Sequence, residues 1–213
     1  MQHPAYDDLI EFATTGPNAN ELAMARGEYA ALTGDLFESD QDFESRIASF
    51  LEWYTLDRQV SHAMNATPAR LYIDHVRSGL TTPELAVLRP LTRTRLTLLD
   101  VKRVKPEVLV VKDLLVNEKL ELHREGVFLA GVESGDVLEG RVFPEGNRLN
   151  LSDNVFVFPR TVRKSILKFT KTFKRATGDR TSVGMVQRCS YLRNRAMRYG
   201  HVDVRQIFRE LAE

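Results

Sequence analysis

Apolar and polar positions recur with different periods in successive parts of the chain. From Asp40 to Tyr54 the apolar residues fall at the spacing of one helical face, and acidic residues in the first turn favour the helix dipole. This face predicts a buried seam of Phe43, Ile47, Phe50, Leu51 and Tyr54, with Trp53 beside it. The first third of the chain is therefore expected to be helical.

Two threonine-proline pairs mark further helix starts in this first third. Thr67-Pro68 and Thr82-Pro83 each place a capping residue before a proline, which is favoured at the first helical position. Gly79 fits the C′ position that follows the helix between them. These signals predict a helix that begins at Pro68 and a second that begins at Pro83.

From Arg93 the apolar period shortens to that of β-strands, and turn residues separate the segments. Five or six short strands at this close spacing are typical of a small antiparallel β-barrel of SH3-like or OB-like type. The expected strand segments are residues 93–104, 107–115, 118–124, 135–144, 147–153 and 154–159.

The helical period returns after Pro159, in the segment TVRKSILKFTKTFKR. One row along this helix is apolar and contains Val162, Ile166, Phe169 and Phe173. A second row with the same spacing is basic and contains Lys164, Lys168, Lys171 and Arg175. The rows are two residues out of phase, a rotation of about 200°, so the basic row lies nearly opposite the apolar one.

Two more helices are expected after this segment, over residues 185–200 and 202–211, and we find no internal repeat. The pattern as a whole predicts an α+β fold. We expect an acidic helical region over 1–88, a small antiparallel barrel over 89–158 and a basic C-terminal helical region over 159–213.

The charge of the chain is strongly uneven, although its formal net charge is only +1. Residues 1–88 contain 14 acidic and 5 basic side chains, a net charge of −9. Residues 159–200 contain 1 acidic and 12 basic side chains, a net charge of +11. Such asymmetry is typical of a basic arm for nucleic acid or membrane, or of a chain whose ends pair with each other.

Composition narrows the class of protein. The N-terminal residues lack the basic and apolar regions of a signal peptide, and no run approaches the ~20 apolar residues of a membrane span. The single cysteine, Cys189, rules out an intrachain disulfide and a CxxC redox or metal site. We therefore expect a cytoplasmic protein with no cofactor and no membrane span.

Three segments carry a resemblance to a known family: FLEWYTLDR (residues 50–58), LLDVKRVKPEVLVVKDLLVNEKLELH (98–123) and VESGDVLEGRVFPEGNRLNLS (132–152). Their order resembles that of a family of uncharacterised bacterial proteins with a helical N-terminal region followed by a small β-barrel. The resemblance covers roughly residues 43–158 and implies the fold. It implies no catalytic residue, because no activity is established for that family.

Signals for an enzyme are weak. The five histidines show none of the spacings that gather zinc ligands, and the chain contains none of the common phosphate-binding or nucleophile motifs. Asp74 and His75 are neighbours on a helix and so do not face each other. A buried, inert Cys189 is favoured over a reactive thiolate. The sequence therefore predicts a protein that is not an enzyme.

Nucleic-acid binding explains the basic segment best, with RNA or the ribosome favoured over operator DNA because no helix-turn-helix pattern is present. Tyr191 and Tyr199 are interleaved with arginines and could stack on unpaired bases. The expected contact residues are Arg160, Arg163, Lys164, Lys168, Lys171, Lys174, Arg175, Arg180, Arg188, Tyr191, Arg193, Arg195, Arg198 and Tyr199.

Three other partners fit the same charge. The basic helices could dock on an acidic protein, or on the acidic face of another copy in a homo-oligomer, as in an adaptor or signalling regulator. The acidic first third could instead cover them within one chain. A membrane surface is a further alternative, weakened because the apolar row contains no Trp.

Overall fold

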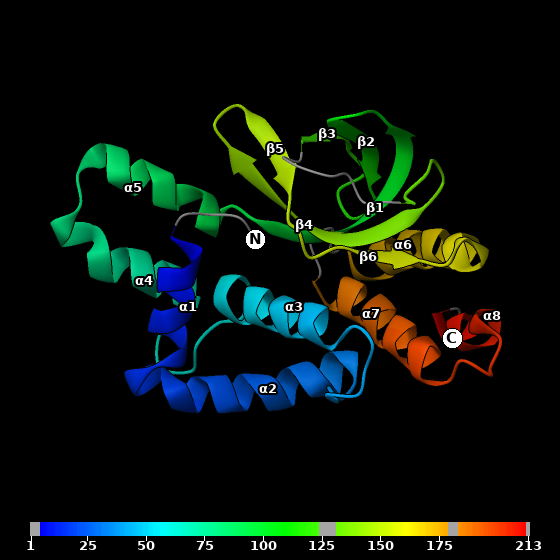
Figure 1. Ribbon diagram of the computed structural model, residues 1–213, viewed down its shortest axis with the longest axis horizontal. Helices are drawn as coiled ribbons and strands as arrows, with labels where there is room; N and C mark the ends of the chain where they lie inside the picture. Colours follow the sequence, from blue (N-terminus) through cyan, green and yellow to red (C-terminus); the bar gives the residue numbers. More distant parts are fainter. Residues whose placement is uncertain (1–4, 124–130, 179–182, 212–213) are drawn as a thin grey trace. The chain divides into compact units, whose positions relative to one another are not determined.

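The computed structural model describes residues 5–123, 131–178 and 183–211, and it confirms the expected α+β fold (Figure 1). The chain divides into two compact units, of which unit 1 is Met1–Ala31 with Asp35–Thr94, and unit 2 is Leu32–Gly34 with Arg95–Glu213. The barrel and the C-terminal helices therefore belong to the same unit. Their assignment to separate domains, 89–158 and 159–213, stays a prediction.

Unit 1 is built from helices, as the apolar pattern predicted. Its α-helices are α1 (Tyr6–Thr14), α2 (Ala19–Thr33, whose last two residues belong to unit 2), α3 (Phe43–Leu56), α4 (Pro68–Val76) and α5 (Thr82–Leu88). Short 3-10 turns join them: η1 (Gly16–Asn18), η2 (Arg77–Gly79) and η3 (Arg89–Thr92).

The predicted seam of α3 is confirmed in part. Phe50, Trp53 and Tyr54 are buried, whereas Phe43, Ile47 and Leu51 are only half-buried. The buried face turns toward Trp53 because Tyr29 of α2 packs against both Phe50 and Trp53, with ring centroids 5.4 Å and 5.3 Å away.

Both predicted helix starts occur, with small corrections. Thr67 caps α4, and its side chain accepts a hydrogen bond from the Arg70 N–H. The cap of α5 is Thr81 rather than Thr82, because Thr81 and Glu84 form a reciprocal capping box. Gly79 lies in the 3-10 turn η2 that extends α4, and it is not the C′ residue.

Unit 2 contains all six predicted strands: β1 (Arg95–Val104), β2 (Val108–Asp113), β3 (Lys119–His123), β4 (Val137–Glu145), β5 (Arg148–Leu151) and β6 (Phe156–Phe158). The first five close into a barrel in the order β1-β2-β3-β5-β4, because β4 also pairs with β1, and β6 adds to β4. All pairings are antiparallel except β3 with β5, which is parallel. This order is that of an OB-type Greek-key barrel rather than an SH3-type one.

Successive residues of β1 pack in different hydrophobic clusters, as expected for a strand that is covered on both faces. Leu99 points into the barrel, where it packs in a cluster with Leu122, Leu138 and other strand residues. Leu98 belongs instead to a cluster that also contains residues of the C-terminal helices. These helices are η4 (Arg160–Val162), α6 (Arg163–Thr177), α7 (Val183–Arg198), α8 (Val204–Ile207) and η5 (Phe208–Leu211).

The residues Asp113, Leu114 and Leu115, at the end of β2, have a structural role. The fully buried Asp113 accepts hydrogen bonds at Oδ1 from the Thr97 hydroxyl (2.7 Å) and from the Leu115 N–H (2.8 Å). It thereby fixes the turn between β2 and β3, and the two leucines that follow are buried in the cluster shared with the C-terminal helices. The motif thus fixes the surface on which α6 lies.

Candidate nucleic-acid interface

The two faces predicted for the segment after Pro159 are present in α6. Val162 and Ile166 are fully buried, and Phe169 and Phe173 pack as half-buried residues against the same cluster. The helix ends where Gly178 takes up a left-handed conformation (φ +69°), which glycine adopts without strain. Because the apolar row is used in packing, only the polar side of α6 is left for a partner.

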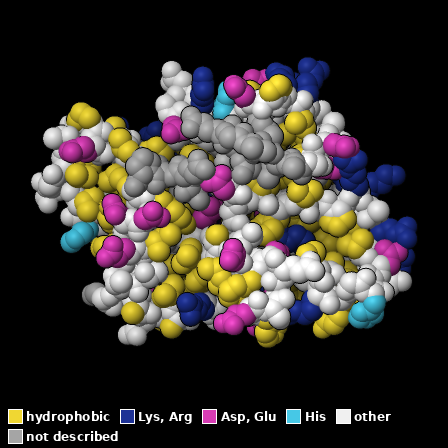
Figure 2. Space-filling view, in the orientation of Figure 1, with side chains coloured by type: hydrophobic (Ala, Val, Ile, Leu, Met, Phe, Trp, Pro, Cys, Tyr) yellow, Lys and Arg dark blue, Asp and Glu magenta, His cyan; other side chains and the backbone are white. Residues whose placement is uncertain are grey.

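The basic row on the opposite side is exposed. It consists of Lys164, Lys168, Lys171 and Arg175. Among the described residues, none of these four side chains forms an ion pair or a hydrogen bond with another side chain. Lys and Arg side chains gather along the right-hand edge of the face shown in Figure 2, the part of the view in which α6 lies in Figure 1.

Three other cations of the segment anchor it to the barrel. Arg160 binds Asp136 (Nε to Oδ1, 2.5 Å) and Glu133 (2.7 Å), and Arg163 binds both oxygens of the buried Asp100 at 3.0 Å. Lys174 Nζ donates to the Leu114 carbonyl at 2.6 Å. Burial raises the pKa of Asp136, but the hydrogen bond from Arg160, the Glu133 N–H and the charge of Arg160 together outweigh it, and the pKa is lowered. These cations are therefore already engaged within unit 2.

The arginines of α7 are more deeply engaged than the sequence suggested. Arg193 is only 6% exposed, and its guanidinium carbon lies 3.5 Å from the centroid of the Phe156 ring. Arg195 and Arg188 both approach Glu210, at 2.6 Å and 3.6 Å. Arg193 is thus a core residue that offers no charge to a partner, whereas Arg198, the last residue of α7, is exposed.

The two tyrosines and Arg180 complete the predicted set. Tyr191 is half-buried in the helical cluster and lies 5.5 Å from the Arg188 guanidinium, so it is not an open stacking platform. Tyr199 is exposed, and its ring meets that of His201 edge to face. Arg180 lies outside the described residues. The predicted surface therefore reduces to the α6 row, with Arg198 and Tyr199 at the end of α7.

One exposed basic segment was not among the predicted contact residues. Residues 102–105, KRVK, form the end of β1 and the start of its turn, and all four are exposed. Three cations within four residues could have indicated a contact region. The alternating apolar pattern, however, predicted only that these residues belong to a strand. Their relation to α6 is visible only in the fold.

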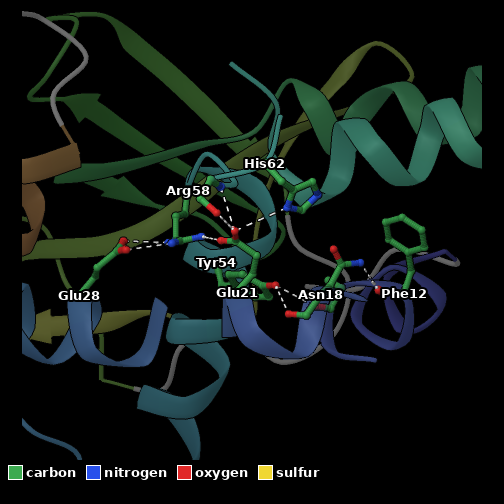
Figure 3. Close-up of polar contacts among 9 residues, drawn as sticks. Phe12, Asn18, Glu21, Glu28, Tyr54, Arg58 and His62 are labelled. Atoms are coloured by element: carbon green, nitrogen blue, oxygen red, sulfur yellow. Dashed lines mark hydrogen bonds and ion pairs between the residues drawn. The ribbon is translucent and has the colours of Figure 1, made fainter. Parts of the chain in front are cut away.

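A second cluster of polar side chains lies in unit 1, around Glu21 (Figure 3). Glu21 of α2 receives hydrogen bonds from Arg58 Nη1 at 2.6 Å, the Ser61 N–H at 2.9 Å and the Ser61 hydroxyl. His62 Nδ1 lies 3.5 Å from the same carboxylate. Burial alone would raise the pKa of Glu21. The hydrogen bonds from Ser61 and Arg58 together have the larger effect, and they lower this pKa to about 2.

A carboxylate with so low a pKa is a poor general base near neutral pH. Arg58 is also saturated, because its other nitrogens bind Glu28 at 2.8 Å, as Figure 3 shows. The cluster joins α2 to the segment after α3. Beside it, the Tyr54 hydroxyl of α3 donates a hydrogen bond to the Ala13 carbonyl of α1 at 2.7 Å. Its chemistry is that of a structural ion pair.

The contribution of Glu21 to stability is expected to disappear in acid. Its pKa in the folded state lies below the ordinary 4.5, so the contribution is complete above that value and is lost as the pH falls toward 2. The difference in free energy of unfolding between wild type and Glu21→Gln should therefore shrink from about pH 6 to about pH 3. Urea titrations at both pH values measure it, and an unchanged difference would contradict the assignment.

Within the part of the chain that the structure describes, neither a metal site nor a reactive thiol is indicated. No group of three or more His, Cys, Asp or Glu side chains in the described ranges is placed to hold a metal ion. Cys189 is buried, and burial raises the pKa of its thiol, with the charge of Glu139 acting in the same direction. Over the described part of the chain, no helix has the length and hydropathy required to cross a membrane.

No family model, no curated protein and no solved structure matches this chain. The case for a function therefore depends on the chemistry of the α6 surface.

Proposed function

We propose that this protein is a non-enzymatic nucleic-acid-binding protein that recognises RNA through the exposed basic row of α6. The observation that carries the proposal is the row itself, Lys164, Lys168, Lys171 and Arg175, whose charges meet no carboxylate among the described residues. The helix contains no acidic residue at all. Like charges at this spacing each cost a helix about 0.2–0.5 kcal/mol, a cost that a bound polyanion removes.

The shape of the row favours a linear polyanion over a single anion. Eleven residues separate its ends, which is about 16 Å along the helix axis, and neighbouring members differ by about 4.5–6 Å in rise. These separations are smaller than the Debye length of about 8 Å at physiological salt, so the fields of neighbouring cations add. A phosphate backbone presents charges with a comparable repeat and can meet all four.

The buried apolar row argues against the membrane alternative. An amphipathic helix binds a bilayer by inserting its apolar face, and in α6 that face is packed in the core of unit 2. The OB-type barrel supports RNA, because barrels of this class commonly bind oligonucleotides. An acidic protein, or the acidic face of a second copy, is the second candidate, since the same unpaired row suits it.

Replacing Lys168 and Lys171 together by alanine tests the proposal. Each phosphate contact contributes about −0.9 to the slope of log K against log salt on duplexes and about −0.7 on single strands. The double variant should therefore flatten the slope by about one to two units and weaken binding across all sequences. Fluorescence anisotropy with a mixed-sequence RNA, at low and physiological salt, measures both quantities.

A matched control removes two other exposed cations of unit 2, Lys119 of β3 and Arg148 of β5. This variant loses the same charge and should keep the wild-type slope, and circular dichroism checks that both variants fold. If the control flattens the slope instead of the α6 variant, the barrel face binds the RNA. If neither changes it, the proposal is wrong, and the α6 variant is then tested for loss of self-association by sedimentation.

A further inference from the structure

Two contacts show which end of α6 lies toward the exposed end of β1. Arg163, at the first residue of α6, binds Asp100 of β1, while Lys174 in its last turn binds the Leu114 carbonyl. The N–H of Leu114 in turn donates to the Leu98 carbonyl at 2.8 Å, so the C-terminal end of α6 lies toward Leu98. The N-terminal end of α6 is therefore directed along β1 toward its exposed residues 102–105.

Asp100 joins the two basic regions. Its side chain is buried between Lys102, whose Nζ lies 2.6 Å from Oδ2, and Arg163 at 3.0 Å, so one negative charge is shared by two cations. Arg160, Asp136 and Glu133 lie at the same junction, since the Ser134 hydroxyl donates to the Lys102 carbonyl at 2.9 Å. Three cations (Lys102, Arg160 and Arg163) therefore face three carboxylates (Asp100, Glu133 and Asp136), and the junction carries no net charge. No net negative charge therefore separates the basic row of α6 from the cations at the end of β1.

Beyond this junction two exposed cations are open to a partner. Among the described residues, the Arg103 side chain makes no ion pair. Lys105 approaches Glu121 at 3.7 Å, but both side chains are largely exposed, and such surface pairs are weak. Glu107, in the same turn, is the one exposed carboxylate of residues 102–107. Its negative charge would repel a phosphate bound at this end of β1.

We infer that the RNA backbone bound by α6 continues over Asp100 onto the exposed end of β1, where Arg103 and Lys105 form a second contact region. The inference rests on the proposed function. The row of α6 spans about 16 Å, and the five residues from Asp100 to Lys105 add about 16 Å of strand. A path of about 30 Å is close to one turn of a duplex, on the order of ten base pairs.

The composition of this path points to double-helical RNA. Its exposed residues are lysine, arginine, threonine and Val104, and the two phenylalanines of α6 pack in the core. Single strands are held largely by aromatic stacking, which these residues cannot supply, whereas RNA duplexes are recognised by shape and phosphate contacts. The substrate class is therefore an RNA duplex, read without regard to sequence.

Two variants of the full chain act in opposite directions on this region. Arg103→Ala with Lys105→Ala should flatten the salt slope on an RNA duplex by about one to two units. Glu107→Gln removes the opposing charge and should tighten binding, a result that loss of folding cannot produce. Wild type should also bind a duplex of about ten base pairs more tightly than one of about five, and the Arg103/Lys105 variant should lose most of that gain.

The outcomes separate this inference from the proposed function. If Lys168→Ala/Lys171→Ala flattens the slope while the Arg103/Lys105 and Glu107 variants match wild type, the path onto β1 is wrong and the α6 interface stands. If none of the variants changes RNA binding, both are wrong. Equal or tighter binding of a single strand of the same length would overturn the duplex as substrate.

Discussion

Replacing Arg58 by methionine is expected to lower the free energy of unfolding of unit 1 by about 3–5 kcal/mol. The side chains of Arg58 and Glu21 are 6% and 5% exposed, and they meet at 2.6 Å. Methionine matches the length of the arginine stem but leaves the buried Glu21 carboxylate without its cation, with Ser61 as hydrogen-bond partner and His62 Nδ1 3.5 Å away. An isolated buried charge is far more costly than the loss of an exposed pair, so the effect is large.

The single tryptophan of the chain, Trp53, lies in α3 and so reports the unfolding of unit 1 by its fluorescence. Glu28→Gln is the matched control, because Glu28 is 46% exposed and its loss leaves the pair with Glu21 intact; we expect less than about 1 kcal/mol. Adding Glu21→Gln to Arg58→Met should recover part of the loss, since no buried charge remains. A loss under about 1 kcal/mol for Arg58→Met would show that the pair is not buried in solution.

The periodicity of the chain was enough to predict many of its elements. All six strands and α3 follow from it, because strand and helix periods are set locally by which side is covered. The threonine-proline pairs predicted α4 and α5, whereas α1 and α2 were covered only by the general expectation of a helical first third. The closure of the barrel was not predictable in detail. The parallel pairing of Leu122 with Leu149 depends on a contact between distant segments, and nothing near either residue in the sequence encodes it.

The candidate site was predictable where charge and helical period coincide. The exposed row of α6 follows from the spacing of Lys164 to Arg175, because a helix with one buried face must expose the opposite one. The same reasoning failed for Arg193, which is basic but lies on the buried side of α7 over Phe156. Counting cations overestimated the free charge, since several of them neutralise barrel carboxylates such as Asp100 and Asp136.

Replacing Phe50 by alanine should cost unit 1 about 3–5 kcal/mol of unfolding free energy. Phe50 is 2% exposed, stacks nearly parallel to Tyr54 (centroids 6.1 Å apart, 11°) and meets Tyr29 edge to face. The substitution removes a whole ring from between two aromatic side chains, and the helices α2 and α3 that carry them can close only part of the cavity. The lost transfer energy and the remaining cavity therefore add.

Phe37→Ala is the matched control for Phe50→Ala, because it deletes the same atoms from a side chain that is 48% exposed in unit 1. Its cost should stay below about 1 kcal/mol. Urea titrations followed by Trp53 fluorescence measure both variants, and the ring contact between Tyr29 and Trp53 places that probe next to the deleted ring. Similar, small losses for the two variants would remove Phe50 from the core of unit 1. A large loss confined to Phe50→Ala would instead establish that α2 and α3 are held together by the aromatic cluster of Tyr29, Phe50, Trp53 and Tyr54.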